Sequence, residues 1–175
     1  MPKLFVVRHA EPEISGVLLG RMDSPLSLKG AVDAQQRLGT LEVQMVYTSP
    51  MRRAVETAQW MERAAGVEIL EDLAEVGLGA WDGMSWLEIE RQNPELARRK
   101  LDDWFGVTPP GGEPWSAVEK RVARALNHIR RGPFPAAVVA HIGVNAEVAR
   151  QVAGVDPRTF SQEYCQVEAY DLSDR

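Results

Sequence analysis

The chain has 175 residues, and 20 Lys and Arg against 25 Asp and Glu give it a formal net charge of −5 at pH 7. This length predicts one domain, residues 1–175, whose core is large enough to be stable without disulfides. The acidic balance argues against nucleic-acid binding, no apolar run approaches the roughly 20 residues of a membrane span, and Leu4–Val7 is too short for a signal-peptide core. The one cysteine, Cys165, excludes an internal disulfide framework and predicts a reducing, cytoplasmic location.

Strand and helix signals alternate along the chain. Short apolar runs predict strands at 4–7, 43–47, 67–70, 136–140 and 166–172. Apolar residues at helical spacing predict helices at 28–38, 49–65, 116–131 and 143–152. Because strands alternate with helices, we predict an α/β fold, a three-layer α/β/α sandwich with a mostly parallel central sheet. In such sheets ligands bind beyond the carboxyl ends of the strands.

Local signals set the ends of these helices. Ser27 is expected to cap the helix at 28–38, which Gly39 closes. Ser49 and Pro50 are expected to serve as the N-cap and first-turn proline of the helix that continues to about Ala65.

The segment between residues 71 and 113 does not follow the strand–helix alternation. Residues 71–83 are irregular and Gly-rich, and helical segments are expected from 85 to about 105, interrupted near Asn93 and Pro94. The sequence PPGGE at 109–113 predicts a loop. We expect residues 84–113 to form a small helical cap insertion that sets specificity, although its aromatic residues could equally serve only to pack the cap.

Two histidines occupy equivalent places at the ends of predicted buried strands. His9 directly follows LFVVR, which brings Arg8 beside it, and His141 directly follows AAVVA. Arg52 and Arg53 fall in the first turn of the helix after the 43–47 strand, where free N–H groups add to their positive field. Arg, which accounts for 16 of the 20 cations, suits bidentate phosphate recognition. A histidine after a strand is often only structural, but this combination indicates a pocket for a phosphate dianion.

Competing chemistries lack their usual motifs. The chain contains no P-loop GxxxxGK[ST] and no GxSxG elbow. Its three histidines and one cysteine show neither HxH nor CxxC spacing, so no metal site is expected. His128 is expected to serve packing or solvation, and Asp102 and Asp103 a solvated helix face.

Several sequence blocks resemble those of the histidine phosphatase superfamily, which has the phosphoglycerate-mutase-like fold. LFVVRHAEPE resembles its opening strand and RHG motif, and the other blocks follow in the family's order over nearly the whole chain. These blocks are GRMDSPLSLKG (20–30), YTSPMRRAVETA (47–58), LAEVGLGAWDG (73–83), PPGGE (109–113) and VVAHIGV (138–144).

The resemblance implies how the phosphoryl group is held. His9 would be the nucleophile that becomes a phosphohistidine, and Arg8, Arg53 and His141 would bind the phosphoryl oxygens. Arg53 is implied rather than Arg52 because it directly precedes Ala54, as in the family's R-A pair.

The resemblance also implies a proton-transfer residue and no cofactor. Glu75 would protonate the leaving oxygen and then take a proton from water, and the family uses neither a metal nor an organic cofactor for this step.

Ser15 stands where many relatives carry a phosphate-contacting Asn and would substitute for it. Ala10 and Ile142 replace glycines that usually follow the two histidines, which puts substrate range and rate in question.

The leading hypothesis is therefore a phosphoric monoester hydrolase of the histidine acid type, acting on a small phosphorylated metabolite. In its short length and its PPGGE segment, the chain resembles the α-ribazole phosphatase and broad-specificity phosphatase branches of the family. The alternatives are a phosphoglycerate mutase and a phosphate-binding regulatory protein that has lost turnover. The expected partner is a small-molecule phosphate ester, with no nucleic acid and no membrane, and a homodimer is left open.

Overall fold

The computed structural model describes residues 2–172, so positions 1 and 173–175 of the predicted domain lie outside the described residues. Its five-stranded sheet has the order β3-β2-β4-β1-β5. The strands are β1 (Lys3–Arg8), β2 (Met45–Thr48), β3 (Gly66–Ile69), β4 (Ala136–Ala140) and β5 (Val167–Asp171). All neighbouring strands are parallel except β5, which pairs antiparallel with β1. The predicted mostly parallel sheet is confirmed.

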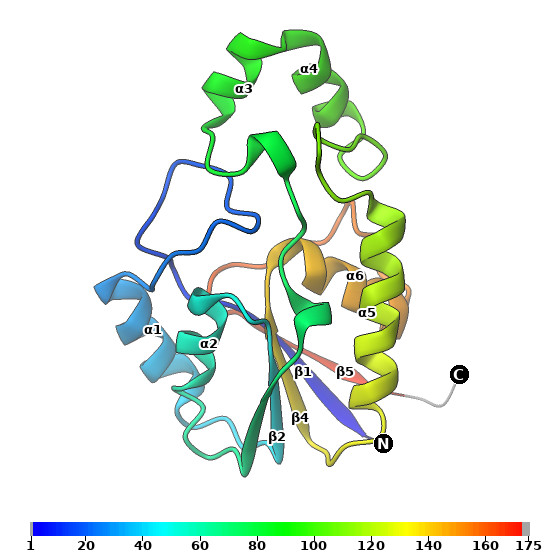
Figure 1. Cartoon of the computed structure of the whole chain (residues 1–175). Coiled ribbons are helices and arrows are strands. Elements are labelled where there is room, and N and C mark those ends of the chain that lie inside the picture. Colours follow the sequence, from blue (N-terminus) through cyan, green and yellow to red (C-terminus); the bar gives the residue numbers. More distant parts are fainter. Residues whose placement is uncertain (1, 173–175) are drawn as a thin grey trace.

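Helices cover both faces of this sheet (Figure 1). Apolar residues of α1 (Leu28–Leu38) and α2 (Arg52–Ala58) pack on one face, against Val7 and Val139. Apolar residues of α5 (Trp115–Ile129) and α6 (Ile142–Ala153) pack on the other, against Val6 and Val138. Because successive strand side chains point to opposite faces, β1 and β4 each supply both cores. The three-layer α/β/α class is confirmed.

The predicted end of α2 is wrong. The helix ends at Ala58 rather than near residue 65, and its N-cap is Met51 rather than Ser49. Beyond Ala58 the backbone forms tighter turns, in which the Met61 N–H donates to the Ala58 carbonyl at 3.0 Å. Within the helix the Thr57 hydroxyl donates to the Arg53 carbonyl at 2.7 Å, a local bond that competes with regular helical bonding. Met61 remains buried, which explains why its apolar spacing resembled that of a helix.

Residues 84–113 rise beyond the carboxyl ends of the strands (Figure 1). This segment contains α3 (Trp86–Gln92) and α4 (Pro94–Asp102), which meet at Asn93 as predicted. We call it the cap segment. It has a small core of its own, formed by Ile89 and Ala97 against Trp81. The short 3₁₀ turns η1 (Glu71–Leu73) and η2 (Gly79–Trp81) lie in the irregular stretch that precedes it.

No helix within residues 2–172 has both the length and the apolar character needed to cross a membrane.

Helix α1 is held closely against the loop that follows β1, and Gly30 makes this approach feasible. A Cβ at Gly30 would overlap the carbonyl oxygen of Glu11. Gly30→Ala should lower the free energy of unfolding by about 1–3 kcal/mol, even though Ala is favoured over Gly in helices by about 1 kcal/mol. Chemical denaturation measures this, with Gln36→Ala, an exposed position on the same helix, as the near-neutral control. A stabilised Gly30→Ala variant would show that the loop yields at no cost.

Candidate active site

Three neighbouring strands end together and bring the predicted site residues to one edge of the sheet. In the parallel register Arg8 lies opposite Ala140, so His9 and His141 follow side by side. Their ring centroids are 5.1 Å apart. Thr48 lies opposite Val139, so Ser49 follows at the same edge from β2.

The ring of His9 has one fixed nitrogen and one free nitrogen. Nδ1 lies 2.7 Å from the Ala10 carbonyl oxygen, which only accepts, so Nδ1 carries the proton and Nε2 keeps its lone pair. Burial, assisted by the charges of Arg53 and Arg8, lowers the pKa of His9 to about 3. The imidazole is therefore neutral at pH 7, and Nε2 can act as a nucleophile.

His141 is fully buried, with Nε2 2.7 Å from the Ser49 hydroxyl. Its Nδ1 has no hydrogen-bond partner among the described residues and lies 3.9 Å from Oε2 of Glu75. Burial and the proximity of His9 and Arg53 lower the pKa of His141 well below its ordinary value. Negative charge brought into the site would raise both histidine pKa values.

The two predicted arginines reach the site from different elements. Arg8, at the end of β1, donates from Nη1 to the Gln162 carbonyl at 2.7 Å, and its guanidinium lies 4.1 Å from the centre of the Tyr164 ring. Arg53, in the first turn of α2, has no exposed surface. It donates to the carbonyls of Met22 and Gly20, both at 2.9 Å. The buried Nε atoms of Arg8 and Arg53 have no hydrogen-bond partner among the described residues.

Arg52, by contrast, points to solvent and pairs with Glu56 one turn further along α2. Within the described residues no hydrogen bond joins Ser15 to the site residues, and this side chain is exposed in the loop after β1. The structure thus brings together His9, His141, Arg8, Arg53 and Glu75, and leaves Ser15 and Arg52 outside the cluster.

Glu75 lies in the irregular stretch between η1 and η2 and enters the site next to His141. Its Oε1 accepts the Val76 N–H at 2.8 Å. Burial raises the pKa of Glu75 to about 7, against the opposing effects of that bond and of Arg53. Gly143 leaves room for this carboxyl group, because a Cβ there would lie 3.2 Å from Oε1. A carboxyl group that titrates near neutral pH can both donate and accept a proton.

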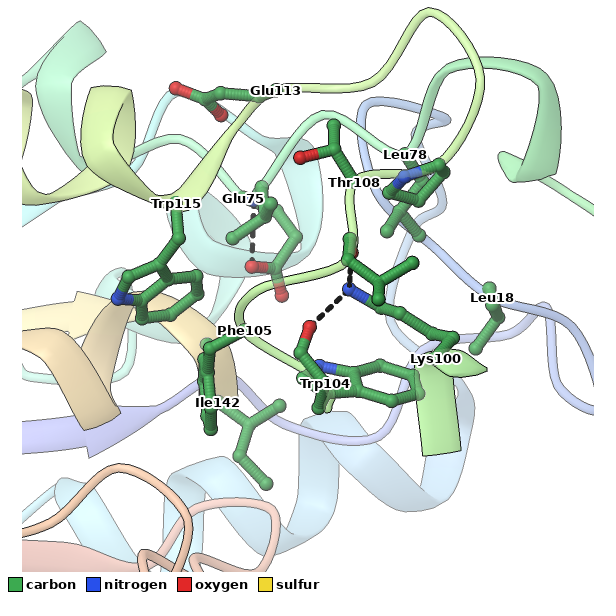
Figure 2. Close-up of a pocket in the computed structure, with 14 residues that line it drawn as sticks. Leu18, Glu75, Leu78, Lys100, Trp104, Phe105, Thr108, Glu113, Trp115 and Ile142 are labelled. Atoms are coloured by element: carbon green, nitrogen blue, oxygen red, sulfur yellow. Dashed lines mark hydrogen bonds between the residues drawn. The ribbon is translucent and has the colours of Figure 1, made fainter. Parts of the chain in front are cut away.

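A cavity of about 140 Å³ opens beside Glu75 on the side of the cap segment (Figure 2). Side chains of the cap segment and of α6 form most of its walls, with Ile142 at the start of α6 among them. Within residues 2–172 no cluster of three or more His, Cys, Asp or Glu side chains is arranged to hold a metal ion.

Sequence reasoning missed the residues that hold Arg8 in place. Tyr164 covers the guanidinium with its ring and tilts against His9, with ring centroids 5.5 Å apart. Cys165 turns the chain back through a left-handed backbone with φ of 57°, and its N–H donates to the Arg8 carbonyl at 3.1 Å. Such a conformation is unfavourable for a non-glycine residue and often occurs at functional sites.

Two amides complete this support. Asn145 on α6 donates from Nδ2 to the Val7 carbonyl at 3.1 Å and to Oε1 of Gln162 at 2.8 Å. Gln162 in turn donates to the Val6 carbonyl at 2.9 Å. None of these contacts has a spacing signal, because the residues are more than a hundred positions from β1.

The mostly parallel sheet, covered on both faces and carrying paired histidines at its carboxyl edge, is the phosphoglycerate-mutase-like fold. The chain belongs to the histidine phosphatase superfamily (branch 1), whose family model matches residues 4–174. The crystal structure of the alpha-ribazole phosphatase from Shigella flexneri superposes with a TM-score of 0.85 at 24% identity, covering 97% of this chain and 90% of that one. At this identity the likeness shows the fold.

Among curated relatives, phosphoserine phosphatase 1 of Hydrogenobacter thermophilus is 30% identical over 98% of this chain and 86% of its own length. The adenosylcobalamin/alpha-ribazole phosphatase of Salmonella typhimurium is 29% identical over 73% of this chain and 66% of its own. Bifunctional protein Rv2228c of Mycobacterium tuberculosis is 34% identical over 80% of this chain, but the match spans only 41% of that longer protein.

The contact between Tyr164 and Arg8 can be tested by phosphate binding. Tyr164→Ala should weaken competitive inhibition by inorganic phosphate roughly three- to thirtyfold, the range expected for loss of a cation–π contact. Tyr164→Phe keeps the ring face and should retain inhibition close to the original. Equal losses in the two variants would assign the effect to the hydroxyl group, and no loss in either would remove Tyr164 from the support of Arg8.

Proposed function

We propose that this protein is a metal-independent phosphomonoesterase that acts through a phosphohistidine at Nε2 of His9. One observation carries the proposal. A neutral, buried His9 with a free Nε2 lies next to His141 and close enough to Arg8 and Arg53 for their charges to lower its pKa. A phosphoryl group attacked there would have cationic or hydrogen-bonding groups around its equatorial oxygens, which is the main requirement of phosphoryl transfer.

In the first step Nε2 of His9 forms a bond to phosphorus as the bond from phosphorus to the leaving oxygen breaks. Glu75, in its protonated form, gives its proton to that oxygen, so the leaving group departs as an alcohol. Burial supports this role because it keeps much of Glu75 protonated near pH 7. The proton on Nδ1 of His9 stays on the ring and is donated in a hydrogen bond to the Ala10 carbonyl, which stabilises the positive charge that develops on the imidazole.

In the second step Glu75, now a carboxylate, takes a proton from a water molecule as the water oxygen attacks phosphorus. The nitrogen–phosphorus bond breaks, releasing inorganic phosphate and restoring neutral His9 and protonated Glu75. Dividing hydrolysis between two transfers is covalent catalysis. The guanidinium groups, fixed by backbone carbonyls and by Tyr164, provide charge compensation in both steps.

Phosphatase relatives support a phosphatase reaction for this chain, but they act on different esters by name, phosphoserine and α-ribazole phosphate. The PPGGE segment resembles that of the α-ribazole and broad-specificity branches, and these branches do not share one ester. We also propose a cytoplasmic setting, because the one cysteine of this chain, Cys165, has no second cysteine with which to form an internal disulfide.

The proposed intermediate should be trapped directly. Brief incubation with a ³²P-labelled phosphate ester, followed by an alkaline quench, should leave acid-labile label on the protein. His9→Ala should carry no label and lose turnover of an aryl phosphate. His128→Ala, which removes an exposed histidine paired with Glu68, is the matched control and should behave as the wild type. Turnover by His9→Ala at the wild-type rate would contradict the proposal.

Two further assays, phosphate release and phosphoglycerate interconversion, separate the two alternatives. A regulatory protein that has lost turnover would release no inorganic phosphate, whereas a phosphoglycerate mutase would interconvert 2- and 3-phosphoglycerate in the presence of the bisphosphate primer. Release of inorganic phosphate without this interconversion is the result that the proposal expects.

The raised pKa of Glu75 predicts how activity depends on pH. The first step needs protonated Glu75, so kcat/KM for an alkyl phosphate should fall as pH rises through about 7. Glu75→Gln should abolish that decline and lower kcat/KM about 10²- to 10⁴-fold for the alkyl ester. For an aryl ester with a good leaving group, the same substitution should lower kcat/KM much less. The pH profile of this ester also shows the effect of ionisation of the substrate phosphate, near pH 6, separately from that of Glu75. Equal losses on both esters would remove the general-acid role.

A further inference from the structure

The cavity beside Glu75 limits what kind of alcohol can leave. Apart from Glu75, its walls are mainly apolar or aromatic, and include Leu78, Trp104, Phe105 and Trp115 (Figure 2). Its volume is about 140 Å³. An apolar protein cavity of roughly 150 Å³ accommodates benzene, so this one fits a leaving group of about six or seven non-hydrogen atoms.

Among the described residues that line this cavity there is one cation, Lys100. Lys100, in the last turn of α4, is only 6% exposed and lines the cavity. Its Nζ donates to the carbonyls of Trp104 and Val107, the latter at 2.6 Å, and lies 4.8 Å from the centre of the Trp104 ring. An ammonium group has three N–H donors, and these two carbonyls account for two of them. Figure 2 shows Nζ within the ring of lining side chains.

The charge of Lys100 has no carboxylate partner in the described part of the chain. Burial lowers the pKa of Lys100 to about 8, against the opposing effect of Asp103, so most of the group is charged at pH 7. Asp103 itself accepts the Gly106 N–H at 2.9 Å, and no ion pair joins it to Lys100 within residues 2–172. A buried cation with neutral partners alone favours an incoming anion.

The second carboxylate in the wall does not compete for this cation. Glu113 is paired with Arg121, through distances of 2.7 and 3.1 Å, and also accepts the Gly77 N–H at 3.1 Å. The protonated form of Glu75 is neutral during the first step. Among the described residues that line the cavity, Lys100 is thus the cation without a carboxylate partner that an entering anionic group meets.

We propose that Lys100 is the specificity-determining group for the leaving group and binds a carboxylate on it, so that the substrates are phosphate monoesters of small hydroxy acids. The inference rests on the proposed phosphatase function. The ester oxygen would face Glu75 while the carboxylate reaches the cap side of the same cavity. A single remaining N–H donor and a single charge match a carboxylate, and the small volume leaves little room for a second phosphate with its larger oxygen shell.

Two pairs of probes isolate the carboxylate. O-phospho-L-serine and O-phosphoethanolamine differ only by this group, and 3-phosphoglycerate and glycerol 3-phosphate differ by a carboxylate in place of a hydroxymethyl group. In each pair the wild-type protein should show a kcat/KM ratio of about ten- to a hundredfold in favour of the acid, the range for one charge-assisted hydrogen bond. Preference for the acid in the first pair alone would identify the ester of an amino acid as the better substrate. Preference in the second pair alone would identify the ester of a hydroxy acid without an amine.

Lys100→Met should reduce these ratios to near one, whereas Arg99→Met, which removes an exposed cation from the same helix, should keep them. A lysine that only closes the turn at Trp104 and Val107 would lower turnover of both members of a pair alike and leave the ratio intact. If Lys100→Met does not fold, Lys100→Gln keeps a donor for those carbonyls without the charge and should give the same loss of ratio.

The outcomes separate this inference from the proposed function. Wild-type turnover of an aryl phosphate with ratios near one in both pairs would overturn the carboxylate site and leave the phosphatase standing. Preserved ratios in Lys100→Met and Lys100→Gln would overturn it as well. Absence of turnover on every ester would instead overturn the phosphatase proposal on which the inference rests.

Discussion

The parallel pairing of β1 with β4 fixes where the site can form. Because β1 and β4 run in the same direction with Arg8 opposite Ala140, their next residues, His9 and His141, must emerge together. The pairing of β2 with β4 adds Ser49 to the same edge. A shift of one residue in either register would move these side chains apart and turn the apolar faces of the strands away from their helices.

Removal of water from this edge sets the protonation states on which the chemistry depends. The same burial keeps His9 and His141 neutral and raises the pKa of Glu75 to about 7, because desolvation disfavours the charged form of each group. Arg8 and Arg53 keep their charge, and Arg53 is held by the carbonyls of Met22 and Gly20 and by Asp23, whose Oδ1 lies 3.8 Å from its Nη1. The site thus combines neutral imidazoles with fixed positive charge, an environment that favours an anionic ligand.

The sequence predicted those parts of the site that follow from strand ends and motif order. Buried strands are visible as apolar runs, so the positions of His9 and His141 followed directly, and the R-A pair separated Arg53 from the exposed Arg52. Long-range contacts left no such trace. Tyr164 reaches Arg8 next to the left-handed turn at Cys165. The hydrogen bond from the Thr57 side chain, which accompanies the short α2, is likewise not visible in the spacing of apolar residues.

In the proposed reaction, recognition of the leaving group and the chemistry fall to different parts of the chain. The residues proposed to bind the phosphoryl group lie at the sheet edge and at the start of α2, while Lys100 and Trp104 belong to the cap segment, which packs around a small core. Substitutions in the cap wall can therefore change the charge and shape that the leaving group meets without altering the register that aligns His9 with His141. Glu75 connects the two parts, because its carboxyl group lies beside His141 and also lines the cavity under the cap.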